Sequence, residues 1–148
     1  MAWIVLTTDR TLMSEYRHIP LGDFAGCAPP NRLPRALFDF IAPKLPASNG
    51  LAIRAPYGLR KLEAALLQGF SEEEVVVAHP DYVEKFIGYD TKIVGVNTMD
   101  PLGLGPVSKL FTWGGPDYFS YTMLGFYTII ERIQSIRDKL GLKFKLVV

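Results

Sequence analysis

The segment Lys92–Pro106 constrains the fold of this chain more than any other part of the sequence. The apolar run Ile93–Val96 ends abruptly in a loop rich in glycine and proline. This pattern predicts a buried strand over Lys92–Asn97 whose carboxyl end opens into that loop. In open α/β sheets, ligands bind at the carboxyl ends of the strands, so the same segment indicates where a binding site would lie.

Predicted strands and helices alternate along the chain. We expect strands over Ala2–Leu6, Glu74–Ala78, Lys92–Asn97 and Leu142–Val148. We expect helices from about Pro56 to Gly69, over Asp81–Phe86, and over Tyr121–Leu140, where Gly141 ends the last one. This alternation predicts an open parallel sheet of flavodoxin-like or Rossmann-like type with helices on both faces. With the strands numbered along the chain, their expected spatial order is 2-1-3-4.

The predicted first strand is followed by an unusually long connection. Residues 11–55 separate it from the next predicted long helix, whereas strand-to-helix connections usually span about 2–6 residues. Pro34 and the apolar residues after it predict a short amphipathic helix inside this connection. We therefore expect residues 1–148 to form a single α/β domain with an ordered insertion that covers the mouth of a site.

Composition excludes several classes of protein. The chain has 148 residues, a formal net charge of +1 and one cysteine, Cys27. A near-neutral charge gives no basic footprint for nucleic acid, and no apolar run is long enough to cross a membrane. The amino terminus lacks the pattern of a secretion signal, which favours a cytoplasmic location. A single cysteine cannot form an intrachain disulfide or supply a cysteine-built metal or iron–sulfur site.

The candidate site lies where the loops after the first and third strands diverge. We expect one concavity there, lined by Thr8, Asp9, Thr98, Met99, Asp100, Gly103 and Gly105, with Tyr57 and Gly58 near its rim. The two aspartates could form an acidic pocket, or each could stabilise its own turn. The two loop glycines could let a ligand approach the backbone, or could only satisfy turn geometry.

Two further features have open interpretations. His79 could cap the short helix that follows it or lie at the surface, and a catalytic role has no visible partner. The aromatic residues around a Gly-Gly pair could stack on a flat cofactor or pack on their own helix; they are Trp113, Tyr118, Phe119 and Tyr121.

Five segments resemble the amino-terminal, cobalamin-binding-type domain of radical SAM enzymes. The central three are Pro56–Leu67, Val75–Val77 and Thr91–Val96, which follow the order of that family's helix start, second strand and third strand. Thr7–Ser14 and Asn97–Pro106 are similar to an archaeal-type branch of it. The resemblance covers nearly the whole chain. It implies a domain that supports cofactor or substrate binding beside a catalytic radical SAM barrel.

The chain also departs from that family's motifs. The family's cobalt-ligating loop has the pattern Asp-x-His-x-x-Gly, whereas Thr8–Leu12 has no histidine. Cobalamin could therefore bind only without a histidine ligand, and the insertion's Tyr16, Phe24, Phe38 and Phe40 could occupy the same space. The Cys-x3-Cys-x2-Cys cluster motif is absent as well. The resemblance thus implies that the [4Fe–4S] cluster and SAM belong to a carboxyl-terminal part, and that this chain is an amino-terminal fragment that is not itself catalytic.

Two alternatives to the radical SAM interpretation remain. The chain could be a stand-alone, flavodoxin-like module that binds a small molecule, or it could be a protein-interaction module. The partner that the resemblance implies is the barrel domain in cis. An exposed sheet edge could also support a homodimer.

Overall fold

The computed structural model describes residues 1–112 and 119–148. Its main sheet has four parallel strands, β1 (Ile4–Thr8), β4 (Val75–Val77), β5 (Ile93–Asn97) and β6 (Lys145–Val147), in the spatial order β4-β1-β5-β6. This is the predicted 2-1-3-4 order, so the sequence-based prediction of an open parallel α/β sheet is confirmed. The arrangement is compatible with a flavodoxin-like or Rossmann-like sheet.

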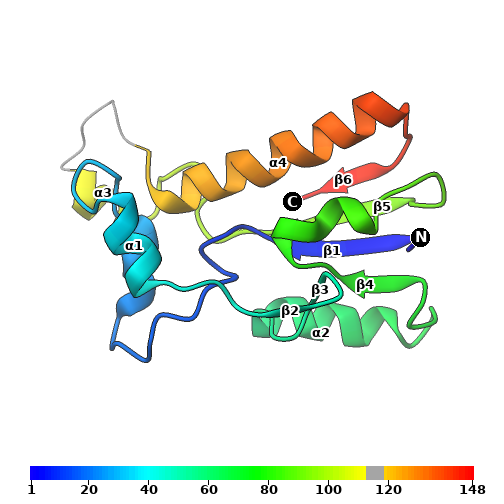
Figure 1. The fold of residues 1–148 in the computed structure, drawn as a ribbon, viewed down its shortest axis with the longest axis horizontal. Helices are drawn as coiled ribbons and strands as arrows, with labels where there is room; N and C mark the ends of the chain where they lie inside the picture. The colour runs from blue at the N-terminus through cyan, green and yellow to red at the C-terminus, as the bar shows by residue number, and fades with distance from the viewer. Residues whose placement is uncertain (113–118) are drawn as a thin grey trace.

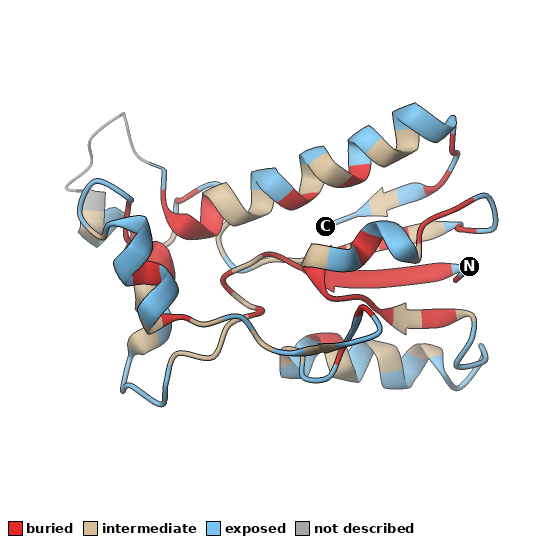
Figure 2. Ribbon diagram, in the orientation of Figure 1, coloured by how far each residue is buried: buried red, intermediate tan, exposed pale blue. Residues whose placement is uncertain are grey.

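The central strand β1 is buried along its whole length (Figures 1 and 2). Alternate side chains of a strand point to opposite faces, and both faces of β1 are apolar. Val5 faces a core formed with the long helix α4 (Tyr121–Leu140) and the 3-10 helix η2 (Pro80–Lys85). Ile4 and Leu6 face a second core that includes Leu59 of helix α2 (Tyr57–Leu66). Helices thus pack on both faces of the sheet.

Helix α4 has the bounds that the sequence predicts, because both of its ends are specified locally. The Ser120 side chain accepts a hydrogen bond from the Met123 amide at the first turn, which satisfies an amide that would otherwise lack a partner. Gly141 ends the helix with φ 62°, a left-handed conformation that suits glycine. The predicted helix over Asp81–Phe86 is instead the 3-10 helix η2, and its cap is His79, whose ring accepts from the Asp81 amide.

The insertion folds beyond the carboxyl ends of the strands (Figure 1). It contains the 3-10 helix η1 (Gly22–Cys27), the predicted short helix α1 (Arg35–Ile41) and an antiparallel hairpin, β2 (Ala47–Ser48) with β3 (Leu51–Ala52). Helix α3 (Pro106–Thr112) follows β5 and lies at the same end of the molecule (Figure 1). The insertion therefore lies over the carboxyl ends of the parallel strands, where ligands bind in open α/β sheets.

No helix within residues 1–112 and 119–148 is long and apolar enough to cross a membrane.

Of the predicted aromatic cluster, Trp113 and Tyr118 lie outside the described residues. Phe119 packs edge-to-face against Tyr127, with ring centroids 6.2 Å apart.

Candidate functional site

Threonine side chains tie the carboxyl ends of three strands together. The Thr8 hydroxyl donates to the Asn97 carbonyl at 2.8 Å, which joins the end of β1 to the end of β5. The Thr7 hydroxyl donates to the Ala78 carbonyl at 3.0 Å, next to the end of β4. Both threonines are fully buried. Thr8, one of the predicted site residues, therefore forms a buried link between β1 and β5 at the point where the loops after these two strands diverge.

Asp9 stabilises the loop that leaves β1. Its Oδ1 accepts hydrogen bonds from the Thr11 amide at 2.8 Å, the Thr11 hydroxyl at 2.5 Å and the Leu12 amide at 3.3 Å. Burial raises the pKa of Asp9, and the hydrogen bonds from Thr11 and Leu12 oppose that rise. Its Oδ2 and the Thr98 hydroxyl oxygen are both buried, and the Thr98 side chain also opposes the rise in the pKa of Asp9.

Asp100 stabilises the loop after β5 in the same way. Its Oδ1 accepts from the Leu104 amide at 3.0 Å, and its Oδ2 accepts from the Gly105 amide at 3.0 Å and the Ser108 hydroxyl at 2.5 Å. A Cβ on Gly105 would lie 2.8 Å from Oδ2, and Gly103 has φ 65°. Both glycines are thus required by this loop, and both aspartates have the local, turn-forming role that the sequence left as one of two options.

The other predicted site residues are more exposed. The Met99 side chain is about half exposed, and Tyr57 is 78% exposed at the first position of α2. Nothing lies within 4 Å of the position that a Cβ on Gly58 would take. The nine predicted residues come from the last position of β1, from the loops after β1 and β5 and from the start of α2, and their role as ligand contacts stays a prediction.

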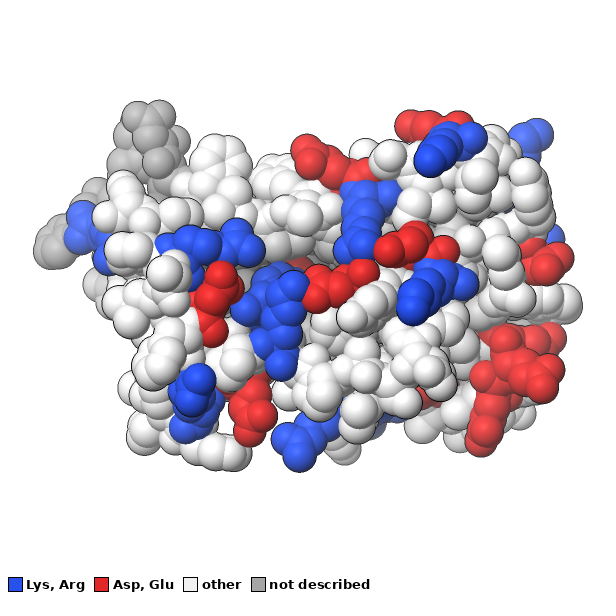
Figure 3. Space-filling view, in the orientation of Figure 1, with Lys and Arg blue, Asp and Glu red and all other residues white. Residues whose placement is uncertain are grey.

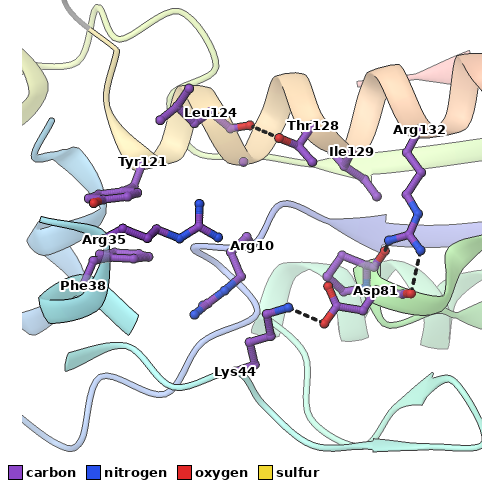
Figure 4. Close-up of a pocket in the computed structure, with 12 residues that line it drawn as sticks. Arg10, Arg35, Phe38, Lys44, Asp81, Tyr121, Leu124, Thr128, Ile129 and Arg132 are labelled. Atoms are coloured by element: carbon purple, nitrogen blue, oxygen red, sulfur yellow. Dashed lines mark hydrogen bonds and ion pairs between the residues drawn. The ribbon is translucent and has the colours of Figure 1, made fainter. Parts of the chain in front are cut away.

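A cavity of about 270 Å³ lies beside these loops, between the β1 loop, the insertion, η2 and α4 (Figure 4). The nine predicted residues are not among those that line it. Its walls are formed by Arg10, Arg35, Phe38, Lys44, Pro80, Asp81, Tyr121, Leu124, Gly125, Thr128, Ile129 and Arg132. The α4 members recur three or four positions apart, which places them on one helix face. That spacing, together with Arg10 directly after Asp9, was the available sequence signal.

Arg10 connects the β1 loop to the insertion. Its guanidinium donates to the Ser14 hydroxyl, to the Ala42 carbonyl at 2.7 Å and to Asp39 Oδ1 at 3.2 Å. Its Nε is buried and has no hydrogen-bonding partner within the described residues. Burial lowers the pKa of Arg10, and the neighbouring Asp39 carboxylate opposes this. A guanidinium remains charged despite such a shift, so Arg10 supplies a fixed positive charge to the cavity wall.

Two more cations lie on the side of the cavity formed by η2. Lys44 Nζ donates to Asp81 Oδ2 at 2.5 Å. Arg132 donates to the carbonyls of Pro80 and Asp81 at 2.9 and 2.8 Å and to Glu84 Oε1 at 2.7 Å. Basic and acidic side chains accordingly intermix across the middle of this face of the molecule (Figure 3).

An aromatic pair forms the opposite wall. Phe38 of α1 stacks on Tyr121 of α4, with ring centroids 3.9 Å apart and planes inclined by 8°. The Tyr121 hydroxyl donates to the Leu33 carbonyl at 2.7 Å. Phe38 is 1% exposed and also lies 5.5 Å from the Arg10 guanidinium carbon. This pair fixes the insertion to the first turn of α4.

The exclusion of a corrin from the carboxyl ends of the strands by the insertion stays a prediction. Of the four insertion residues expected to fill the space, Phe38 is buried and Tyr16 is half-buried, whereas Phe24 and Phe40 lie at the surface. The cavity is slightly smaller than the roughly 300–1,000 Å³ of pockets for drug-sized ligands, and a corrin is larger than such ligands. Both ring nitrogens of His79 have partners. Nδ1 accepts from the Asp81 amide as the cap of η2, and Nε2 lies 3.1 Å from the Leu45 carbonyl oxygen.

The described residues also contain no group of three or more His, Cys, Asp or Glu side chains that could hold a metal ion. No protein-family model matches the chain, nor does any curated protein or solved structure. The residues that line the cavity therefore indicate what it can do. They offer fixed positive charges, an aromatic wall and a small, partly open volume.

Proposed function

We propose that this chain is the amino-terminal, cobalamin-domain-like part of a cytoplasmic radical SAM enzyme, in which it supports cofactor or substrate binding beside a catalytic barrel in cis. The observation that carries this proposal is the β4-β1-β5-β6 order of the parallel sheet. It places the long loops after β1 and β5 at one switch point, where Rossmann-like domains bind their ligands. The segments around α2, β4 and β5 follow one another along the chain in the order that the resemblance implies.

Within this proposal, the domain does not bind a corrin by itself. The loop after β1, Thr8–Leu12, lacks the histidine of the family's motif, and the insertion packs at the carboxyl ends of the strands through Phe38 and Tyr121. Iron–sulfur and SAM chemistry would belong to residues of the barrel. The domain's contribution is to position a substrate or a second group at its carboxyl edge, and a homodimer through the exposed sheet edge is compatible with that role.

The cavity favours a second candidate, a stand-alone module that binds a small molecule. It is lined by residues of this chain alone, and four of them are cations. Such a site needs no barrel to be complete.

The complete reading frame separates the two candidates. If the first is correct, the codons after Val148 encode Cys-x3-Cys-x2-Cys, and the full-length protein, reconstituted with iron and sulfide and then reduced with dithionite, shows the electron paramagnetic resonance signal of a [4Fe–4S]1+ cluster, which changes when SAM is added. A frame that stops soon after Val148, or one without those cysteines, would contradict the radical SAM proposal and leave the stand-alone module.

A further inference from the structure

We propose that the cavity between α1 and α4 binds the anionic group, phosphate or carboxylate, of a small molecule. This inference rests on the second candidate function, the stand-alone module, and deepens it by naming the chemical class of the ligand that this chain would bind without a barrel.

The first observation is the convergence of positive charge. The side chains of Arg10, Arg35, Lys44 and Arg132 line one small cavity, and Asp81 is the single acidic residue among the described residues that line it. These four come from the β1 loop, α1, the rest of the insertion and α4, so the fold brings them together. Asp39 and Glu84 pair with members of the set from outside the lining. Among the described residues, these four cations against three carboxylates leave an excess of positive charge that an anion would balance.

The second observation is that Arg35 has donors to spare. Its Nε donates to Asp39 Oδ2 at 3.2 Å, and its two terminal nitrogens have no hydrogen-bonding partner within the described residues. Figure 4 shows the guanidinium pointing from α1 toward the middle of the cavity, above Arg10. A planar guanidinium with both terminal nitrogens available binds carboxylate or phosphate through two parallel hydrogen bonds.

The third observation sets the size and polarity of the remaining ligand. Leu124, Ile129 and the Phe38–Tyr121 stack form apolar walls, and Gly125 adds no side chain. The Thr128 hydroxyl already donates to the Leu124 carbonyl at 2.7 Å, so it can only accept a hydrogen bond from a ligand. The cavity therefore suits a compact anion with a small apolar or planar part.

Isothermal titration of the whole chain with inorganic phosphate, pyrophosphate and benzoate tests this proposal. We expect at least one probe to bind, and the affinity to fall as salt concentration rises. Binding of the phosphates alone identifies a phosphate-bearing ligand, and binding of benzoate alone identifies a carboxylate.

Arg35→Met should weaken that binding by about tenfold to a hundredfold, the value of charge-assisted hydrogen bonds to one guanidinium. Arg54→Met is the matched control, because Arg54 is 67% exposed and pairs with one carboxylate, as the 70% exposed Arg35 does, but does not line the cavity. A second variant, Thr128→Trp, fills the cavity from an exposed helix position without changing charge, and should abolish binding.

Three results would overturn the proposal. The first is the absence of binding for all three probes at millimolar concentration. The second is an equal loss in Arg35→Met and Arg54→Met, which would mean unspecific attraction to surface charge. The third is unchanged binding in Thr128→Trp, which would place the anion elsewhere. Circular dichroism spectra matching the wild type establish that each variant is folded. None of these results depends on whether a barrel follows this chain, so they are separate from the test of the radical SAM proposal.

Discussion

Replacing Phe38 by alanine should detach the insertion from the sheet's carboxyl edge. The Phe38 side chain is 1% exposed and stacks on Tyr121 at 3.9 Å. Truncating a buried phenylalanine costs about 3–5 kcal/mol in the free energy of unfolding, and a stacked aromatic pair accounts for about 0.5–1.5 kcal/mol of that. Such a loss is a large part of the roughly 5–15 kcal/mol that stabilises a typical domain.

Urea denaturation followed by circular dichroism measures this loss, and amide hydrogen exchange shows where it is located. We expect faster exchange in α1 and the first turn of α4, with the strands less affected. Phe40→Ala is the control: Phe40 lies in the same helix but is 63% exposed, with the Arg17 guanidinium 4.6 Å from its ring. It should cost less than about 1 kcal/mol. Equal losses in the two variants, or a loss below about 1 kcal/mol for Phe38→Ala, would refute the packing described above.

Three further predictions concern the caps and loops around the site. Burial lowers the pKa of His79, so on acidification the unfolded chain takes up a proton that the folded chain does not. The free energy of unfolding should therefore fall as pH drops from about 7 to 5. The variant His79→Asn can still cap η2, and urea titrations at several pH values should show a flatter profile for it. Burial raises the pKa of Asp9, so the neutral side chain of Asp9→Asn should leave the free energy of unfolding at neutral pH equal or higher. Asp9→Ala should instead lower it by about 1–3 kcal/mol, because buried amides lose their partner. Equal effects of the two variants would refute the turn-forming role. Gly105→Ala should cost about 1–3 kcal/mol, because its Cβ would lie 2.8 Å from Asp100 Oδ2, whereas Gly58→Ala, with open space around it, should be nearly neutral in thermal denaturation.

The parts of the fold that the sequence predicts are those specified by local patterns. Helix α4 begins after a serine cap and ends at Gly141, and both signals lie within the helix's own sequence. The strands β1 and β5 are apolar runs bounded by polar loops, and the alternation with helices leaves few orders for a parallel sheet. By contrast, the hairpin of β2 and β3 has strands of two residues each, too short to leave a periodic pattern.

The site was harder to predict because its walls are distant in sequence. Arg10 lies next to the predicted Asp9, yet the partners that hold its guanidinium, Asp39 and Ala42, come from the insertion. Arg35 and Arg132 line the same cavity although nearly a hundred positions separate them in the sequence. No spacing rule connects residues that only the packing of α1 on α4 brings together. The turn-forming role of Asp9 and Asp100, in contrast, could be predicted from the sequence, because their hydrogen-bonding partners lie within eight positions of them along the chain.

The most direct test of the account is a titration of the purified chain with hydroxocobalamin, monitored by visible absorption. We propose that the insertion closes the carboxyl edge of the parallel sheet to a corrin, with Phe38 and Tyr121 as the closing contact. The account predicts a corrin spectrum that does not shift, and binding weaker than micromolar. A micromolar or tighter complex with a shifted corrin spectrum would contradict it.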